Sequence, residues 1–419
     1  MDSFISRNVA DLVRGALERF SVVVVEGVRR SGKSTLAAAL VEGLLHAIVS
    51  FDDAETRAAA QADPHTFLEP ALNGRTMVID EGQRSPEIIF AVKSLVDADR
   101  RPGRFALIGS SKLLAAPEAP DSLADWAVSI RLRPFSQGGL AGRKEDYVDQ
   151  LLTWPEQIAA VRSDWRRADY ARAAYLGVYP EIQGLESPWR ALWLDSCAER
   201  LLSRDARSVV ERISAARLRA VARLLAANQA GELVKAGVAR DAGISANSVT
   251  TCLDAPSRLF VVEAVQPWTA NPRRRETGRP KTVIGDSGLA AHLAKASLER
   301  LLSDAGGNLL GSAIEGLVAL ELLKQRSWSQ QRWDLFHYRD RRGLEVEAAV
   351  ELADGRVVLI EVKAASSYRS EHFAASKQLA GQLGDRLAAG VVLAADHGYR
   401  HDRNLFGLPI SALWENWAG

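Results

Sequence analysis

Short apolar blocks that end in glycine, serine or acidic residues recur in the first third of the chain. They lie at 22–25, 48–51, 76–79 and 105–108, and residues 128–133 alternate between apolar and polar positions. Stretches of helical periodicity separate several of these blocks. Strands that alternate with helices predict an α/β fold in which a mostly parallel sheet carries helices on both faces.

The patterns change further along the chain, and 419 residues are too many for one hydrophobic core. We expect four parts: residues 1–144, a helical lid or spacer at 145–226, residues 227–302, and a C-terminal part at 303–419 that begins with a linker at 303–308. In the helical part, the core candidates are Trp154, Trp165, Trp189 and Trp193.

The first apolar block runs directly into a glycine-rich sequence. Residues 27–35 read Gly-Val-Arg-Arg-Ser-Gly-Lys-Ser-Thr, which fits the pattern G-x-x-x-x-G-K-[ST], and a helical stretch follows at 36–41. Such a loop directs backbone N–H groups at a phosphate, and the helix N-terminus adds a partial positive charge there. The alternative is a chance glycine-rich turn. We expect ATP to be bound by Gly27, Arg30, Ser31, Gly32, Lys33, Ser34 and Thr35, with Lys33 on the β- and γ-phosphates and Ser34 on Mg²⁺.

A second chemical signal follows at 76–81, where an apolar strand ends in Asp80 and Glu81. The carboxyl ends of parallel strands are the ligand-binding edge of such a sheet. Asp80 would hold Mg²⁺ through water, and Glu81 would orient or deprotonate the attacking water. Ser110, at the tip of the strand at 105–108, would sense the γ-phosphate. The alternatives are a solvated acidic turn and an ordinary strand-to-loop turn.

Residues 233–256 have the pattern of a helix-turn-helix, with Gly243 at the turn. The predicted second helix carries no Lys or Arg, but a basic loop at 271–281 lies between two short apolar strands, as the wing of a winged helix would. The loop would supply the phosphate contacts that the helix lacks. We expect nucleic acid as a partner, DNA rather than RNA, and the alternative is a module that packs against protein.

The alternation at 344–352 and the apolar strand at 356–363 flank a turn at 353–355 and predict a β-hairpin. Its register would place Glu347 opposite Glu361 and Glu345 opposite Lys363. Two opposed carboxylates repel, and Mg²⁺ or Mn²⁺ between them would remove that cost. Lys363 would then steady a developing charge or orient a water. The alternative is the charged, solvated face of an edge hairpin.

Composition restricts the remaining possibilities. Lys plus Arg is 53 and Asp plus Glu is 52, so a polyanionic partner must be held by a local patch. Two cysteines leave no disulfide framework and no cysteine-rich metal site. The N-terminal residues lack a signal h-region, and the apolar stretch at 36–51 is too short to span a bilayer. We expect a cytoplasmic protein without a membrane partner, and a homo-oligomer is possible.

Several stretches resemble the bacterial and archaeal ATPases that join an N-terminal AAA domain to a C-terminal DUF4143 region. The matching stretches are 27–35, 78–84, 109–111, 132–137, 177–181, 286–293 and 360–363. The resemblance implies a P-loop AAA-type ATPase core at 1–144, a helical segment, a winged helix-turn-helix at 227–302, and a C-terminal α/β restriction-endonuclease-like domain at 303–419.

In PD-(D/E)XK nucleases, to which that last domain is similar, acidic residues and a lysine hold Mg²⁺ and cut phosphodiesters. The positions that match are Glu315, Glu347, Glu361 and Lys363. Glu347 stands where the family has Asp. Residues 123–126 read Leu-Ala-Asp-Trp where relatives tend to have an arginine, for which Arg131 or Arg133 would substitute.

These observations predict an ATP-binding and ATP-hydrolysing switch that acts on nucleic acid and carries a Mg²⁺-dependent nuclease-like domain, active or vestigial. The alternative is a regulatory DNA- or protein-binding ATPase whose C-terminal domain only docks.

Overall fold

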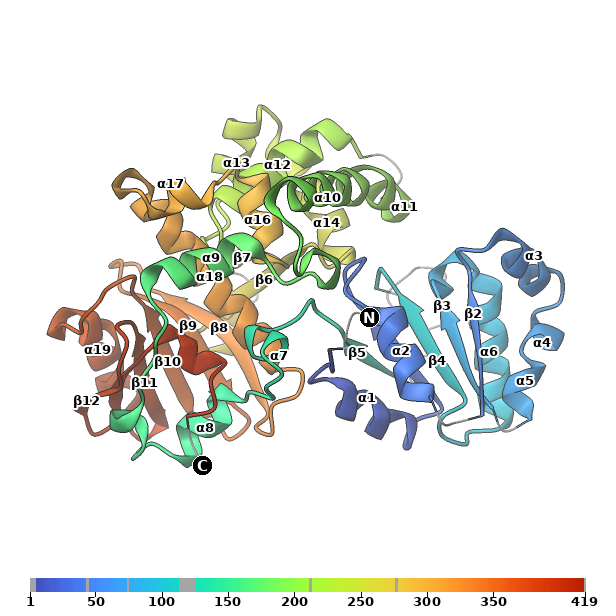
Figure 1. Ribbon diagram of the computed structural model, residues 1–419, viewed down its shortest axis with the longest axis horizontal. Helices are drawn as coiled ribbons and strands as arrows, with labels where there is room; N and C mark the ends of the chain where they lie inside the picture. The colour runs from blue at the N-terminus through green and yellow to red at the C-terminus, as the bar shows by residue number, and fades with distance from the viewer. Residues whose placement is uncertain are drawn as a thin grey trace. The chain divides into compact units, whose positions relative to one another are not determined.

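The computed structural model describes residues 5–42, 45–73, 75–112, 126–210, 213–275 and 278–417. The chain divides into two compact units. Unit 1 contains Met1–Phe135, Tyr179–Glu181 and Arg258–Phe260, and unit 2 contains the remaining residues (Figure 1). Most of the predicted ATPase core therefore lies in unit 1, and most of the other three predicted parts lies in unit 2.

Unit 1 is built on a five-stranded sheet. Its strands are β1 (Val22–Glu26), β2 (His46–Ser50), β3 (Thr76–Asp80), β4 (Phe105–Gly109) and β5 (Ala127–Arg131). Their order is β2-β3-β4-β1-β5, and every neighbouring pair is parallel. The predicted parallel sheet is confirmed.

Helices cover both faces of this sheet (Figure 1). On one face lie α1 (Ala10–Leu17) and α2 (Lys33–Val41), and on the other lies α6 (Pro86–Ala98), which contacts the short helices α3 (Ala54–Ala62) and α4 (Pro64–Phe67). Helix α5 (Glu69–Leu72) lies between α4 and β3 in the chain. The core under α6 contains alternate residues of three strands, among them Val22, Val24, Met77, Ile79, Phe105 and Leu107.

Helix α1 has one buried face. Val13 and Ala16 are buried beside Leu17, whereas Leu12 and Phe20 are 45% and 43% exposed.

Unit 2 contains an eight-stranded sheet. Its strands are β6 (Val262–Pro267), β7 (Lys281–Ile284), β8 (Trp333–Arg339), β9 (Glu345–Leu352), β10 (Val357–Val362), β11 (Leu387–Leu393), β12 (Tyr399–Asp402) and β13 (Leu405–Leu408). The order is β12-β13-β11-β10-β9-β8-β6-β7. Because β6 pairs with β8, the sheet continues across the boundary predicted at residue 302.

The remaining helices belong mostly to unit 2. They are α7 (Gln137–Leu140), α8 (Tyr147–Thr153), α9 (Arg167–Leu176), α10 (Ser187–Arg200), α11 (Ala206–Val209), α12 (Ala215–Ala227), α13 (Lys235–Ala242), α14 (Ala246–Arg258), α15 (Pro272–Arg275), α16 (Ser287–Leu293), α17 (Leu298–Leu302), α18 (Gly307–Gln325) and α19 (Ala374–Leu383). The predicted helical character of 145–226 is confirmed, but two predicted core residues are not buried: Trp154 is 38% exposed and Trp189 is 63% exposed.

Helix α18 is the central helix of unit 2. Residues 303–308, predicted as a linker, instead form a 3-10 turn and the start of this helix. Within the described residues, the segment Asp304–Gln325 has the length and composition to cross a membrane, but 56% of its most apolar window is buried. It packs in the core formed with alternate residues of β10, and the other residues of β10 face α19.

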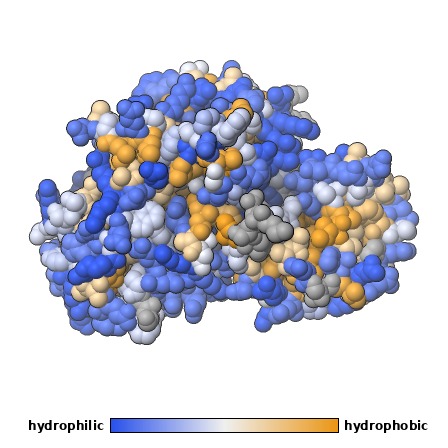
Figure 2. All heavy atoms as spheres, in the orientation of Figure 1, coloured by the Kyte–Doolittle hydropathy of each residue, from blue (hydrophilic) through white to orange (hydrophobic). Residues whose placement is uncertain are grey.

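The visible surface is mainly hydrophilic, with hydrophobic side chains in smaller patches (Figure 2).

Two of the stretches that carry the family resemblance pack against each other in unit 2. The Asp286 carboxylate is fully buried and accepts hydrogen bonds from the backbone N–H groups of Val178 and Leu289, both at 2.8 Å. A Cβ at Gly177 would lie 2.5 Å from Asp286 Oδ1, and Gly177 has φ +72°. These residues therefore join α9 to α16 and have a structural role.

Candidate functional site: a phosphate-binding loop and an acidic strand end

The glycine-rich loop joins β1 to α2, as predicted. Arg30 and Gly32 both have positive φ, 65° and 89°. A Cβ at Gly27 would lie 2.0 Å from the carbonyl oxygen of Leu132, so only glycine fits there. Helix α2 begins at Lys33, and its N-terminus therefore lies at the loop.

Lys33 and Ser34 occupy the positions expected of phosphate and magnesium ligands. The Lys33 ammonium is buried and donates to the carbonyl oxygens of Gly27 and Val28, both at 3.0 Å. Ser34 Oγ donates to Asp80 Oδ2 at 2.6 Å. The loop and the acidic strand end, 46 residues apart, thus meet at one edge of the sheet. Thr35 is exposed on the first turn of α2.

Asp80 and Glu81 have different surroundings. Burial raises the pKa of Asp80, against the opposing effect of the hydrogen bond from Ser34. Glu81 is 7% exposed and has φ 56°, a backbone conformation that is uncommon for a residue other than glycine. Strain of this kind occurs at functional sites.

Three side chains hold the Glu81 carboxylate. Ser110 Oγ donates to Glu81 Oε2 at 2.9 Å, and Gln83 Nε2 donates to the same oxygen at 2.5 Å. Arg29 lies 3.7 Å from Glu81 Oε1. Ser110 therefore connects the ends of β3 and β4, where a residue that responds to a bound phosphate would lie.

The residues present fit a nucleotide with Mg²⁺. Ser31 Oγ is buried and has no hydrogen-bond partner among the described residues, so a ligand oxygen would satisfy it. Ser34 and Asp80 provide oxygen ligands of the kind that Mg²⁺ prefers, and the metal would neutralise phosphate charge.

Two supporting residues were not predicted from the sequence. Arg7, which is 8% exposed, donates to the carbonyl oxygen of Ser31 at 3.0 Å and lies 4.2 Å from the centre of the Phe135 ring. Burial lowers the pKa of Arg7 to about 10. Glu181 lies 3.7 Å from Arg30. Only the stretch at 177–181, matched through the resemblance, pointed to Glu181, and no pattern pointed to Arg7.

The substitutes proposed for an arginine near residue 126 lie on and beside β5. The Arg131 guanidinium lies 4.6 Å from the centre of the Phe260 ring, and the Arg133 carbonyl accepts a hydrogen bond from Arg7. Residues 123–125 lie outside the described residues. The role of either arginine stays a prediction.

The second predicted site lies in unit 2, on the hairpin of β9 and β10. The predicted register is confirmed from the turn, where Leu352 N donates to Arg356 O at 2.8 Å, as far as the pair Ile360–Ala348. The pairing of β9 with β8 shifts between Phe336 and Tyr338, so an extra residue lies in β9 there. The β9–β10 ladder has ended at this point, and the predicted pairs Glu347–Glu361 and Glu345–Lys363 are not part of it.

Lys281 of β7 lies between two of these carboxylates. Its side chain is 5% exposed; Nζ lies 2.9 Å from Glu345 Oε1 and also pairs with Glu347. Burial alone would lower the pKa of Lys281, but Glu347 and Glu345 outweigh it and raise the pKa. Sequence reasoning assigned Lys281 to a phosphate-binding loop and missed this role.

Glu315 and Glu361, the other predicted acidic ligands, both interact electrostatically with Glu347. Glu315 of α18 lines a small cavity with Lys281 and Glu347, and burial followed by repulsion from Glu347 raises its pKa to about 8. Glu361 is paired with Lys363 at 2.5 Å, and burial raises its pKa. Within the described residues, no group of three or more His, Cys, Asp or Glu side chains is arranged to hold a metal ion. The assignment of Glu315, Glu347 and Glu361 to one metal site stays a prediction.

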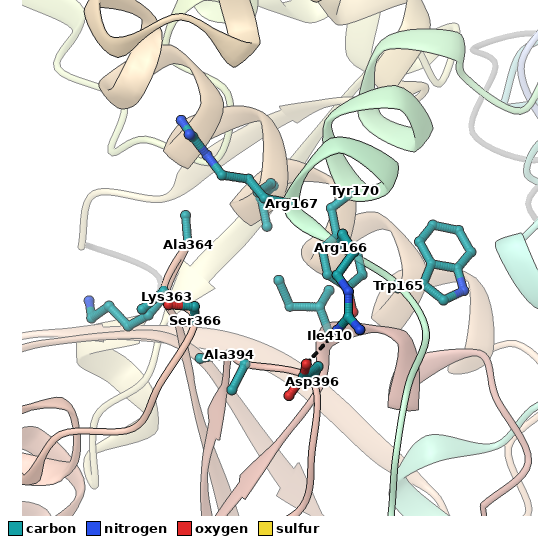
Figure 3. Close-up of a pocket in the computed structure, with 13 residues that line it drawn as sticks. Trp165, Arg166, Arg167, Tyr170, Lys363, Ala364, Ser366, Ala394, Asp396 and Ile410 are labelled. Carbon is teal, nitrogen blue, oxygen red and sulfur yellow. Dashed lines mark hydrogen bonds and ion pairs between the residues drawn. The ribbon is translucent and has the colours of Figure 1, made fainter.

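A pocket of about 210 Å³ lies beside Lys363 in unit 2 (Figure 3). It lies after the carboxyl ends of the parallel strands β10 and β11, at the start of α9. Trp165 and Tyr170 line it, and Arg166 is ion-paired with Asp396 across it. The pocket lies at an edge where α/β sheets bind ligands.

The predicted helix-turn-helix segment contains α13 and α14, joined at Gly243 with φ 64°. Polar residues of α14 are exposed, and Lys235 Nζ donates to Thr250 Oγ1 at 3.3 Å.

The basic loop at 271–281 has fewer side chains available for phosphate contacts than predicted. Arg275 is ion-paired with Glu351 at 2.5 Å, and Lys281 is buried, whereas Arg273 and Arg279 are exposed. Residues 276 and 277 lie outside the described residues. Two of the predicted phosphate contacts are thus used inside the unit.

A glycine-rich loop at the start of α2 and an acidic pair at the end of β3, on one parallel sheet, define a P-loop ATPase domain. The family model of an AAA domain matches residues 19–140, and that of a domain of unknown function, DUF4143, matches residues 310–413. These matches support a P-loop ATPase domain at residues 19–140 and a DUF4143 domain at residues 310–413. Another domain of unknown function, DUF8612, matches residues 167–300, across the boundary predicted at 226.

Known proteins are similar to much of the chain. Uncharacterized proteins of Mycobacterium bovis and Mycobacterium tuberculosis are each 28% identical over 366 residues, which cover 86% of this chain and 74% of theirs. Among solved structures, a Walker-type ATPase of Pyrococcus abyssi is 13% identical, with a TM-score of 0.40, and covers 70% of this chain and 96% of its own. A STAND-type signal transduction ATPase of Pyrococcus horikoshii is 10% identical, with a TM-score of 0.25, and covers 77% and 46%.

Proposed function

We propose that the protein hydrolyses ATP and uses the nucleotide state of unit 1 as a switch that acts on nucleic acid. The observation that carries the hydrolysis is the hydrogen bond between Ser34 and Asp80, because it brings the loop for phosphate to the acidic strand end. Mg²⁺, when bound there, would supply charge neutralisation on the phosphates.

Glu81 is the proposed catalytic residue for water. Its carboxylate is held by Ser110, Gln83 and Arg29, so it is positioned before substrate binds. Positioned groups of this kind contribute more to a transition state than mobile ones do. Lys33 would leave the carbonyl oxygens of Gly27 and Val28 for the phosphates.

The test is ATP binding and hydrolysis by the purified full chain and by the variant Lys33→Ala. Loss of a hydrogen-bonded cation on the phosphates should weaken ATP binding by about 10- to 100-fold. The variant Lys93→Ala is the control, because Lys93 lies on α6 and pairs with Asp97. A Lys33→Ala variant that binds ATP as tightly as wild type would refute the site.

The action on nucleic acid is supported by polar residues on α14, by Lys235 beside Thr250, and by the exposed Arg273 and Arg279. The test is the binding of labelled duplex DNA and of single-stranded RNA across a salt series. The double variant Arg273→Ala/Arg279→Ala should reduce the salt slope by about one for each phosphate contact that is lost. An unchanged slope would show that the loop does not contact phosphate.

A second candidate for the C-terminal part is favoured by the ion pairs of Lys281. We infer that this part docks nucleic acid or protein without cutting it, the alternative to a Mg²⁺- or Mn²⁺-dependent nuclease with Lys363 in the catalytic role. Metal-dependent cleavage of DNA or RNA that disappears in Lys363→Ala would establish the nuclease instead.

A further inference from the structure

Glu345 and Glu347 in unit 2 form ion pairs with a lysine of the same chain. Lys281 is the first residue of β7, and its ammonium contacts Glu345 and Glu347 together. Glu345 also lies 3.3 Å from Arg339. The two carboxylates of β9 that would bind a divalent cation therefore already have cationic partners.

The backbone around Lys281 is held on several sides. Leu233 N donates to Pro280 O at 2.8 Å, Thr282 N donates to Gly231 O at 3.1 Å, and Ala230 N donates to Thr282 O at 2.9 Å. Lys281 also forms a β-bridge with Glu232. The ammonium is thus delivered by a strand that is fixed in place, unlike a surface lysine that moves freely.

The space near the ammonium is nearly filled. Lys281, Glu315 and Glu347 line a cavity of about 10 Å³, at the lower limit for a single water molecule. A hydrated Mg²⁺ or Mn²⁺ ion needs several oxygen ligands about 2 Å away and usually keeps waters. Such an ion would have to displace the Lys281 side chain.

We propose that the Lys281 ammonium is the permanent counter-ion of Glu345 and Glu347 and occupies the position of a divalent cation beside Glu315. Removal of that side chain would uncover a metal site that the native chain keeps closed. The C-terminal sheet would then be held to the β6–β7 hairpin by an ion-pair cluster that needs no metal. This inference is independent of ATP hydrolysis in unit 1.

The test compares the thermal unfolding of the full chain and of two variants, Lys281→Ala and Lys281→Ala/Glu347→Gln, without nucleotide, in EDTA and in Mn²⁺. Lys281→Ala leaves Glu347 without its Lys281 partner and leaves Glu345 paired with Arg339 alone, so its midpoint in EDTA should fall by roughly 5–10 °C. Mn²⁺ should recover at least half of that loss in Lys281→Ala. The double variant should show no such recovery, and it controls for Mn²⁺ bound at the P-loop.

A folded Lys281→Ala protein that gains no Mn²⁺-dependent stability over the double variant would overturn the proposal. The single variant Glu347→Gln tests it with the Lys281 side chain still in place: electron paramagnetic resonance should count the same number of bound Mn²⁺ ions as in wild type. One ion fewer in Glu347→Gln would show that the native cluster binds metal and would also overturn it.

Discussion

Ser34 Oγ donates a 2.6 Å hydrogen bond to Asp80 Oδ2. The two residues lie at the start of α2 and the end of β3, so the contact depends on the parallel order of β1, β4 and β3. A hydroxyl and a carboxylate in this arrangement suit Mg²⁺ that is held directly by one group and through water by the other.

Asp80→Asn should therefore weaken the dependence of hydrolysis on Mg²⁺ while ATP binding without metal is unchanged. An outer ligand of this kind is worth about 10- to 100-fold in metal affinity or activity. The measurement is the ATPase rate across a Mg²⁺ titration. Asp52→Asn is the control, because Asp52 is paired with Arg84 at 2.9 Å and belongs to the same edge of the sheet. Equal Mg²⁺ dependence in both variants would argue against Asp80 as a ligand.

Glu81→Gln should separate binding from chemistry. The amide keeps the size of the side chain but cannot act as a base, so kcat should fall by about 10²- to 10⁴-fold while ATP affinity is kept. Single-turnover hydrolysis and nucleotide binding on the same sample provide the measurement. Ser110→Ala, which removes one hydrogen bond to Glu81, should have a smaller effect. If the Glu81→Gln variant hydrolyses ATP at the wild-type rate, Glu81 is not the catalytic base.

The sequence predicts the glycine-rich loop and the acidic strand end because the residues of each are contiguous. Residues 27–35 are contiguous, and the acidic pair directly follows an apolar strand. The parallel order of the sheet then brings Ser34 and Asp80 together. Arg7 was not predicted because its partner is a backbone carbonyl, and a backbone contact leaves no pattern of side chains in the sequence.

Only part of the second site, on the hairpin of β9 and β10, could be predicted from the sequence. The hairpin register was predictable from the turn at 353–355, and it is confirmed up to Ile360–Ala348. The shift in the pairing of β8 with β9 and the approach of Lys281 depend on contacts between distant strands. The alternation of apolar and polar residues along one strand predicts neither of these features.

Gly177→Ala should destabilise unit 2 strongly. The new Cβ would lie 2.5 Å from Asp286 Oδ1 and 2.8 Å from Gly288 Cα, and the positive φ adds strain. We expect a loss of about 2–4 kcal/mol in the free energy of unfolding, measured by urea denaturation.

Gly184→Ala is the matched control for backbone strain alone. Gly184 has φ +79°, but no atom of the described residues lies within 4 Å of the position that a Cβ would take there. Its cost should be about 1 kcal/mol. Equal losses in the two variants would show that the contact with Asp286 contributes nothing.

Acid should destabilise the protein through His337. This side chain is buried, its Nε2 lies 3.0 Å from the Arg279 carbonyl oxygen, and burial lowers its pKa from 6.5 to about 4. Between these two values the unfolded chain binds a proton that the folded chain does not, so stability falls as the pH decreases from 6.5 to 4. The loss in the free energy of unfolding reaches about 3 kcal/mol at the lower end of this range, and it is absent above pH 6.5.

His337→Gln keeps a donor for the Arg279 carbonyl and removes the titration. The variant should lose less stability than wild type between pH 6.5 and pH 4, measured by urea unfolding across that range. His65→Gln is the control, because His65 lies on α4 in unit 1 and should leave the wild-type pH dependence in place. If His337→Gln and wild type lose stability in parallel, the buried imidazole is not the source of the acid sensitivity. The carboxylates that pair with cations, such as Glu345 with Lys281, would then account for it, because the pKa of Glu345 is lowered and its pairing is lost on protonation.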